Sequence, residues 1–264
     1  MENWDIHISS ETTSLKINVN EILRYKDLIF MFVKRDIITI YKQTILGPIW
    51  FVVQPIMTML IYIFVFGNIA NISTDGLPQS LFYLAGIVLW NYFSECFIQI
   101  SETFNHNKEI FGKVYFPRLV VPFSKLISSS VKFLIQFLLF LIFLIYYKFN
   151  LNVISPSSWI LIAPFLFLIL SALALGFGLI FSSLTSKYRD LKFLMQFGIQ
   201  LLMFSTPIIY PLSSLKGNLL FVMKFNPLTH IMEAFKFCFL GNGYFSFFGL
   251  SYSIIFTFII VLLG

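Results

Sequence analysis

The sequence changes character within one stretch, KRDIITIYKQTILGPIWFVVQP, which runs from Lys34 to Pro55. Its first nine residues include three basic residues and one acidic residue, whereas the apolar run that follows the Gly47–Pro48 pair carries no charge. Proline is tolerated in the first turn of a helix, because the backbone N–H that it lacks has no helical partner there. We therefore predict that a membrane-spanning helix begins at Gly47–Pro48, after a segment at the membrane surface.

Composition places the whole chain in a lipid bilayer. Of its 264 residues, 58% are hydrophobic and 11% are charged, whereas a soluble domain has about 25% charged residues. This difference excludes a water-soluble globule. The 18 lysines and arginines exceed the 12 acidic residues, and such a surplus is typical of loops at the cytoplasmic face. It does not indicate a nucleic-acid partner, because no basic surface with aromatic platforms lies on a soluble module.

Six segments are apolar over about 20 residues, the length a helix needs to cross the hydrocarbon core. An open sheet would leave unpaired backbone groups in lipid, so helix is the expected state. We predict an all-α integral membrane protein with a six-helix transmembrane domain over residues 47–264. The spans are expected at about 48–66, 81–100, 119–147, 159–184, 191–212 and 245–263.

Basic residues predict the orientation of these spans. They gather in the N-terminal region, in the loop after the second span and in the loop after the fourth. These three regions share one side of a six-span chain, which the positive-inside rule assigns to the cytoplasm. The first 20 residues are polar and contain no apolar signal-peptide core. We therefore expect a multi-pass protein of the inner (cytoplasmic) membrane with both termini, including the polar segment 1–20, in the cytoplasm.

Residues 21–46 are predicted to form an amphipathic helix that lies along the lipid headgroups. Apolar residues recur there at helical spacing, while most charged residues fall on the other face. The apolar face is expected to consist of Ile22, Tyr25, Ile29, Phe32, Val33, Ile37 and Ile40.

Residues 213–244 are apolar enough for the membrane, yet they contain several charged side chains and the pair Asn226–Pro227. The residue before a proline disfavours helix, so a break is expected at this pair. Broken backbone at membrane depth is tolerated where it is buried in protein. The sequence therefore predicts an external re-entrant helical hairpin.

No enzyme or ATPase motif is found. Gly112–Lys113 is followed by Val114 and no earlier glycine completes a phosphate-binding loop, so the chain is not its own P-loop ATPase. His7, His106 and His230 are scattered without metal-ligand spacing, so no metal site is expected. The two cysteines are far apart in the sequence, which indicates packing rather than a disulfide.

Polar residues within the predicted spans are candidates for function, because they are costly in lipid. Lys125 and Lys132 lie near the cytoplasmic end of a long third span, and snorkelling to the interface is the preferred interpretation. For Glu95, a buried interhelical hydrogen bond is preferred over a proton-coupled role. The remaining candidates are Gln54, Asn91, Gln99, Gln136, Gln196 and Gln200.

Aromatic residues make up 19% of the chain. Lipid-facing packing and interfacial belts account for most of them, but aromatic faces also suit a pathway for sugars. Spacing alone does not separate these two interpretations. The candidate stripe on the first span is Trp50, Gln54, Met57, Tyr62 and Phe66.

The predicted cytoplasmic loop NHNKEIFGKVYFPR covers residues 105–118. A short helix that exposes Ile110 and Phe111 between charged residues is suited to docking in a groove of a soluble partner. An amphipathic loop on the headgroups explains the same pattern, and both interpretations stay open on chemistry alone.

Five blocks in order along the chain resemble the ABC-2 transport permeases, and among them the exporters of O-antigen or teichoic-acid polysaccharides. The blocks are LIFMFVKRDIITIYKQTILGPIWFVVQP (28–55), GIVLWNYFSE (86–95), GKVYFPRLVVP (112–122), SKYRDLKFLMQFGIQLLMFSTPIIYP (186–211) and FNPLTHIMEAFK (225–236). The resemblance implies a homodimeric permease that works with two copies of a separate ATPase subunit, which would bind ATP and Mg²⁺. It also implies export of an undecaprenyl-diphosphate-linked glycan, with the chain itself holding no cofactor.

The resemblance assigns roles to individual residues. The ATPase-coupling interface would be Asn107, Lys108, Glu109, Ile110, Phe111 and Lys113. Uptake of the lipid diphosphate would involve Arg35, Lys42 and Gln43, since a diphosphate needs fixed positive charge. The external gate would lie at the broken segment of Asn226 and Pro227, with His230 and Glu233. For the translocation pathway, our own expectation is a conduit between the first and fifth spans of two protomers, lined by the first-span stripe with Gln196 and Gln200.

Three other functions compete with this interpretation. An exporter of the same fold that carries a drug or a lipid would have the same helices. A membrane enzyme of lipid-linked sugar synthesis would need acid–base residues in its loops, which here are scattered. An ion-coupled secondary transporter would rest on Glu95 alone.

Overall fold

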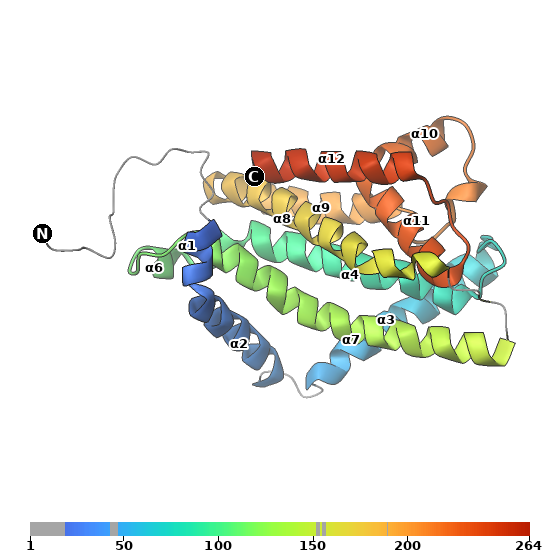
Figure 1. Ribbon diagram of the computed structural model, residues 1–264, viewed down its shortest axis with the longest axis horizontal. Helices are drawn as coiled ribbons and strands as arrows, with labels where there is room; N and C mark the ends of the chain where they lie inside the picture. The colour runs from blue at the N-terminus through green and yellow to red at the C-terminus, as the bar shows by residue number, and fades with distance from the viewer. Residues whose placement is uncertain (1–18, 43–46, 152–153, 155–156, 189) are drawn as a thin grey trace, which may run out of the picture.

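The computed structural model describes residues 19–42, 47–151, 154, 157–188 and 190–264 (Figure 1). Every regular element in these ranges is a helix, so the predicted all-helical membrane class is confirmed. Most of the predicted polar segment 1–20 lies outside the described residues.

Four helical stretches are long and apolar enough to cross a bilayer. The first joins the 3₁₀ turn η1 (Gly47–Ile49), α3 (Trp50–Tyr62) and the π-helix η2 (Ile63–Ile69). It begins at Gly47, as the sequence predicts. The others are α4 (Gln79–Ser101), α7 (Val120–Leu151), and α8 (Ala163–Lys187) with the preceding turn η3 (Ser158–Ile162).

Two further apolar helices, α9 (Leu191–Phe204) and α12 (Phe247–Leu263), are shorter. At 1.5 Å per residue, the 14 residues of α9 extend about 21 Å, less than the hydrocarbon thickness of about 30 Å. The fifth predicted span therefore continues as a non-helical segment through Pro207, whose ring disfavours helix in the residue before it. The count of six spans stays a prediction.

Helix α4 lies at the centre of the bundle, packed against α7 and α8, while α12 covers the far side of α8 (Figure 1). The side chains of α4 are buried along most of the helix. The approach of α8 to α12 is close, because a Cβ added at Gly176 would lie 2.9 Å from the backbone nitrogen of Val261. Packing at such distances is available only to glycine and fixes the register of the two helices.

The segment predicted to lie on the headgroups forms two helices, α1 (Val19–Arg24) and α2 (Lys26–Lys42). Two residues of its predicted apolar face, Phe32 and Val33, are buried, and Phe32 packs against the start of α7 and the segment before it. A second apolar strip is exposed instead, and it consists of Leu23, Phe30, Met31 and Ile38. These residues also recur at helical spacing, so periodicity alone did not distinguish the lipid face from the packed face.

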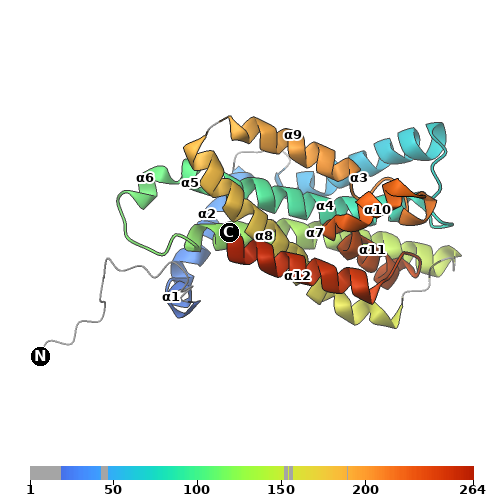
Figure 2. The ribbon, with the colours of Figure 1, turned by 90° about the horizontal axis from the view of Figure 1, so that it is seen from above.

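The two ends of the bundle carry different short helices (Figure 2). Helices α5 (Thr103–His106) and α6 (Lys108–Phe111) lie at one end, and α10 (Asn218–Phe225) and α11 (Pro227–Leu240) lie toward the other. The predicted break at Asn226–Pro227 is where α10 and α11 meet. The Asn226 side chain accepts a hydrogen bond from the Leu228 N–H and donates one to the Ser205 carbonyl, so it caps α11 and ties it to the end of α9.

Candidate functional site

The predicted coupling residues lie on α6 or next to it, and they divide into an outward and an inward set. Lys108, Glu109 and Lys113 are exposed. Asn107 is 5% exposed, and its side-chain amide donates to the Thr103 carbonyl at 2.9 Å. Its amide is thus committed within the chain, and the charged residues beside it form the accessible surface.

Ile110 and Phe111 were expected to be exposed, and this expectation is wrong. Both are half-buried, and the Phe111 ring stacks on Phe116 at 5.3 Å, which in turn lies 6.1 Å from Phe32 of α2. The short helix thus packs its apolar side on α2, which removes that area from water. The exposed apolar side chains at this end are Val114 and Tyr115, with 59% and 67% of their area exposed. The sequence alone did not indicate which of the neighbouring rings, Tyr115 or Phe116, packs inward.

Glu102, at the end of α4, connects this end of the bundle to α9. Its carboxylate lies 2.7 Å from the Lys192 ammonium and 3.3 Å from the His106 ring nitrogen. These groups line a cavity of about 330 Å³, together with Lys108 and Thr185. A charged link between α4, α5 and α9 follows from this arrangement.

The cations predicted to meet a lipid diphosphate lie at the C-terminal half of α2. Arg35 is exposed but shares the Asp36 carboxylate with Lys125 of α7, at 2.9 Å and 2.6 Å respectively. Lys42 is exposed at the last turn of α2. Gln43 lies outside the described residues. Lys42 is thus the more available cation, because part of the Arg35 charge is offset by Asp36.

A polar groove runs between α3, α4 and α7 at the level of the predicted spans. Lys132 of α7 forms an ion pair with Glu95 of α4, and Gln99 donates to the same carboxylate at 2.7 Å. Asn91 donates to Gln136 at 3.4 Å. These residues and Gln54 of α3 line a cavity of about 310 Å³, apart from Lys132 at its edge.

Lys125 and Lys132 were expected to snorkel to the interface, and this stays a prediction. Each finds a carboxylate within the chain, Asp36 and Glu95 respectively. An ion pair satisfies both charges within the chain, and the partner of Lys125 lies on α2, the helix predicted at the interface. The interhelical hydrogen bond preferred for Glu95 is confirmed, although the Glu95 side chain is half-buried rather than buried.

The predicted pathway stripe on α3 divides into two parts. Trp50, Gln54 and Met57 are exposed. Tyr62 and Phe66 are half-buried in an aromatic contact of 5.4 Å, and the Tyr62 hydroxyl donates to the sulfur of Met203 on α9. Only the first part remains accessible to a partner or a solute.

Gln196 and Gln200 are exposed on α9, on a face otherwise made of large apolar side chains. Figure 2 shows α9 along the same side of the bundle as α3. Both helices carry exposed glutamines, Gln54 on α3 and Gln196 and Gln200 on α9.

The predicted gate residues lie around α11, whose side chains are almost all buried. His230 makes a hydrogen bond of 2.9 Å to the Lys224 carbonyl, and Glu233 accepts one of 3.0 Å from the Tyr244 N–H. Lys236 was not among the predicted site residues, yet it is 1% exposed and places its ammonium over the Phe82 ring at 3.7 Å. Lys236 also lies 3.6 Å from Glu233, at the i, i+3 spacing that signals such a pair in a helix.

Comparison with known proteins agrees with these features. The O-antigen export system permease protein RfbA of Klebsiella pneumoniae is 27% identical over 95% of this chain and 94% of its own length. A protein of the same description from Myxococcus xanthus is 24% identical over 83% of this chain and 82% of its own. The polysialic acid transport protein KpsM of Escherichia coli is 24% identical over 75% and 76%.

The family model described as ABC-2 type transporter matches residues 27–240, from α2 to the end of α11. This match covers the interface helix, the helices long enough to span the bilayer, the α5–α6 segment and the broken pair α10–α11. The chain therefore belongs to the ABC-2 type transporter family.

Proposed function

We propose that this chain is the permease subunit of an ABC exporter that moves an undecaprenyl-diphosphate-linked polysaccharide across the inner membrane. The cargo would be an O-antigen, capsule or teichoic-acid type of glycan, and the role would belong to lipopolysaccharide or related envelope biosynthesis. Two copies of the chain would form a homodimer with two copies of a separate ATPase subunit, which binds ATP and Mg²⁺. The names of the relatives support the export of a polysaccharide.

One observation supports a conduit formed between two copies of the chain. Gln54, Gln196 and Gln200 are exposed on the apolar helices α3 and α9, and an amide that faces hydrocarbon costs several kcal/mol, roughly, when it has no hydrogen-bond partner. A second copy placed against α3 and α9 would enclose these amides in a polar path. The same contact would cover the large apolar side chains that α9 exposes.

The orientation in this proposal has six spans with both termini in the cytoplasm. The α5–α6 end then faces the ATPase, and Lys108, Glu109, Lys113, Val114 and Tyr115 offer it a charged and apolar surface. Arg35 and Lys42 of α2 lie at the cytoplasmic interface, where fixed positive charge favours a lipid diphosphate. The pair α10–α11 lies at the external side as a re-entrant gate.

Two measurements test the proposal. The tagged chain is purified in detergent, the copurified proteins are identified by mass spectrometry, and the ATPase activity of the complex is measured with and without lipid-linked polysaccharide from the same cells. We expect an ATPase in a 1:1 ratio with this chain and a turnover that responds to the glycan lipid. Deletion of the chain should leave the polysaccharide inside the cell. A chain recovered without an ATPase, or a deletion strain that still displays the polysaccharide, would contradict the proposal.

A further inference from the structure

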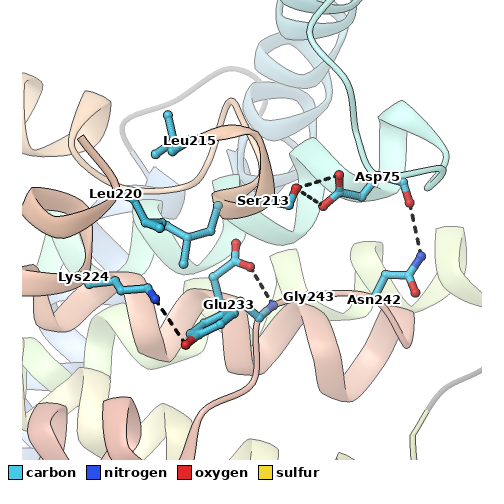
Figure 3. A pocket seen from close by; sticks show the side chains of 10 residues that line it. Asp75, Ser213, Leu215, Leu220, Lys224, Glu233, Asn242 and Gly243 are labelled. Carbon is cyan, nitrogen blue, oxygen red and sulfur yellow. Dashed lines mark hydrogen bonds between the residues drawn. The ribbon is translucent and has the colours of Figure 1, made fainter. Parts of the chain in front are cut away.

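A cavity of about 450 Å³ lies at the α10–α11 end of the bundle (Figure 3). It forms where three segments far apart in the sequence meet, namely the turn before α4, the region from η4 (Leu212–Ser214) to α10, and the segment after α11. Its volume falls within the range of about 300–1,000 Å³ that is typical of small-molecule sites. We call it the outer cavity and define it by Asp75, Ser213, Lys224, Glu233, Asn242 and Tyr244.

One wall of the outer cavity is held together by Asp75. The Ser213 hydroxyl lies 2.6 Å and 2.8 Å from the two carboxylate oxygens of Asp75, and the Asn242 amide donates to the Asp75 carbonyl at 3.2 Å. These contacts join residues 138 and 167 positions apart. A carboxylate oxygen can accept more than one hydrogen bond, so the Asp75 carboxylate retains acceptor capacity.

The floor of the outer cavity is Glu233, whose carboxylate points into the space between Leu220 and Gly243 (Figure 3). Glu233 is 3% exposed, and its Oε2 accepts a hydrogen bond from the Tyr244 N–H. Its buried Oε1 has no hydrogen-bond partner among the described residues. The Lys236 ammonium lies 3.6 Å from this oxygen, beyond hydrogen-bond distance. A buried acceptor without a donor is costly, so this oxygen favours a ligand that brings a hydroxyl group.

An aromatic surface completes the outer cavity. The Lys224 ammonium lies over the Tyr244 ring at 4.4 Å and donates to its hydroxyl at 3.2 Å. Beyond this pair lies a second cavity of about 300 Å³, which shares Lys224 and Tyr244 and adds the rings of Phe248 and Tyr252. Carboxylate acceptors next to exposed aromatic rings suit a ligand that has both hydroxyl groups and apolar faces.

The charges of the outer cavity decide between ligand classes. Two carboxylates, Asp75 and Glu233, and one ammonium, Lys224, line the cavity, while Lys236 lies behind Glu233. A phosphate placed there would meet two like charges. We propose that the outer cavity binds a neutral sugar unit of the exported polysaccharide, an inference that rests on the proposed function. The site would hold the glycan at the external end of the permease, apart from the lipid diphosphate.

The test uses the full chain in its complex with the ATPase. The probe is the polysaccharide of the same cells, freed from its lipid by mild acid, and binding is measured by saturation-transfer NMR. Asp75→Asn keeps the shape of the side chain and removes its charge. Glu233→Gln makes the same change at the floor of the outer cavity. Asn218→Ala is the matched control, because Asn218 is exposed on α10 outside the cavity lining. Inorganic pyrophosphate is the comparison ligand.

We expect the polysaccharide to bind the unmodified complex, and Asp75→Asn to weaken binding about tenfold, the effect of losing one hydrogen bond to a charged group. The Asn218→Ala complex should bind the polysaccharide as tightly as the unmodified complex does, and pyrophosphate should not compete with the polysaccharide. Equal binding by Asp75→Asn, Glu233→Gln and the unmodified complex would overturn the assignment, as would competition by pyrophosphate. Export in cells separates the two proposals. If deletion of the chain abolishes export but all variants bind the polysaccharide equally, only the sugar site in the outer cavity is rejected. If export continues without the chain, the proposed function is rejected.

Discussion

The ammonium of Lys192, in the first turn of α9, lies 2.7 Å from the carboxylate of Glu102, one residue beyond the end of α4. Glu102 precedes α5, and α6 comes after it, so this ion pair links the short segment to α9. In the proposed exporter, α9 lines the conduit and α5–α6 meets the ATPase. The pair is therefore positioned to couple the two.

Removal of this pair should uncouple the transporter more than it destabilises it. Lys192 has 43% of its side chain exposed, and pairs of this kind contribute at most about 1 kcal/mol to stability. We expect Glu102→Gln to keep the ATPase activity and to lower export per ATP hydrolysed, measured in proteoliposomes. The exchange Glu102→Lys with Lys192→Glu should restore part of the export. If the double exchange is no better than either single change, the pair does not carry the coupling.

The surface that meets the ATPase should centre on Val114 and Tyr115 rather than on Phe111. Tyr115→Asp and Val114→Asp change exposed side chains, so we expect normal thermal stability with loss of the copurifying ATPase. Phe111→Asp would place a charge among Phe32 and Phe116 and should cost several kcal/mol, roughly, because the charge is taken from water. Stability is measured by thermal unfolding in detergent and association by pull-down. Normal association of the Tyr115→Asp, Val114→Asp double variant would place the docking surface elsewhere.

The ion pair of Glu95 with Lys132 should stabilise the fold as a unit. Glu95→Gln leaves the Lys132 cation without its partner inside the polar groove and should lower the free energy of unfolding by about 3 kcal/mol. The double variant Glu95→Gln, Lys132→Met removes both charges and should recover much of that loss. Lys148→Met, at the exposed far end of the same helix, is the control. Additive losses in the double variant would show that the two side chains act independently.

The contact between α8 and α12 should not tolerate an added methyl group at Gly176. A Cβ at position 176 meets backbone atoms of α12 at 2.9–3.0 Å, so Gly176→Ala should cost about 1–3 kcal/mol. The matched change Gly198→Ala adds its methyl to open space on α9 and should raise helix stability by about 1 kcal/mol. Thermal unfolding in detergent compares the two variants. An equal response at both positions would mean that the α8–α12 interface is looser than its distances indicate.

The sequence alone determined the features that depend on neighbouring residues. Apolar runs of bilayer length required helices, because backbone groups cannot remain unpaired in lipid. The first span begins at Gly47, and the chain breaks at Asn226–Pro227, since both positions follow from local proline and glycine geometry. The family was also visible in the order of five sequence blocks.

Only the tertiary structure decided which polar and aromatic side chains meet. Lys132 reaches Glu95 across 37 positions, and Asn242 reaches Asp75 across 167. Phe111 was expected to be exposed, but it packs near Phe32 because α2 folds back on the start of α7. Periodicity identifies the face of a helix but not its partner, and a partner far along the chain is selected by how the helices pack. The polar groove and the outer cavity exist for that reason, since each is built from segments that become neighbours only on folding.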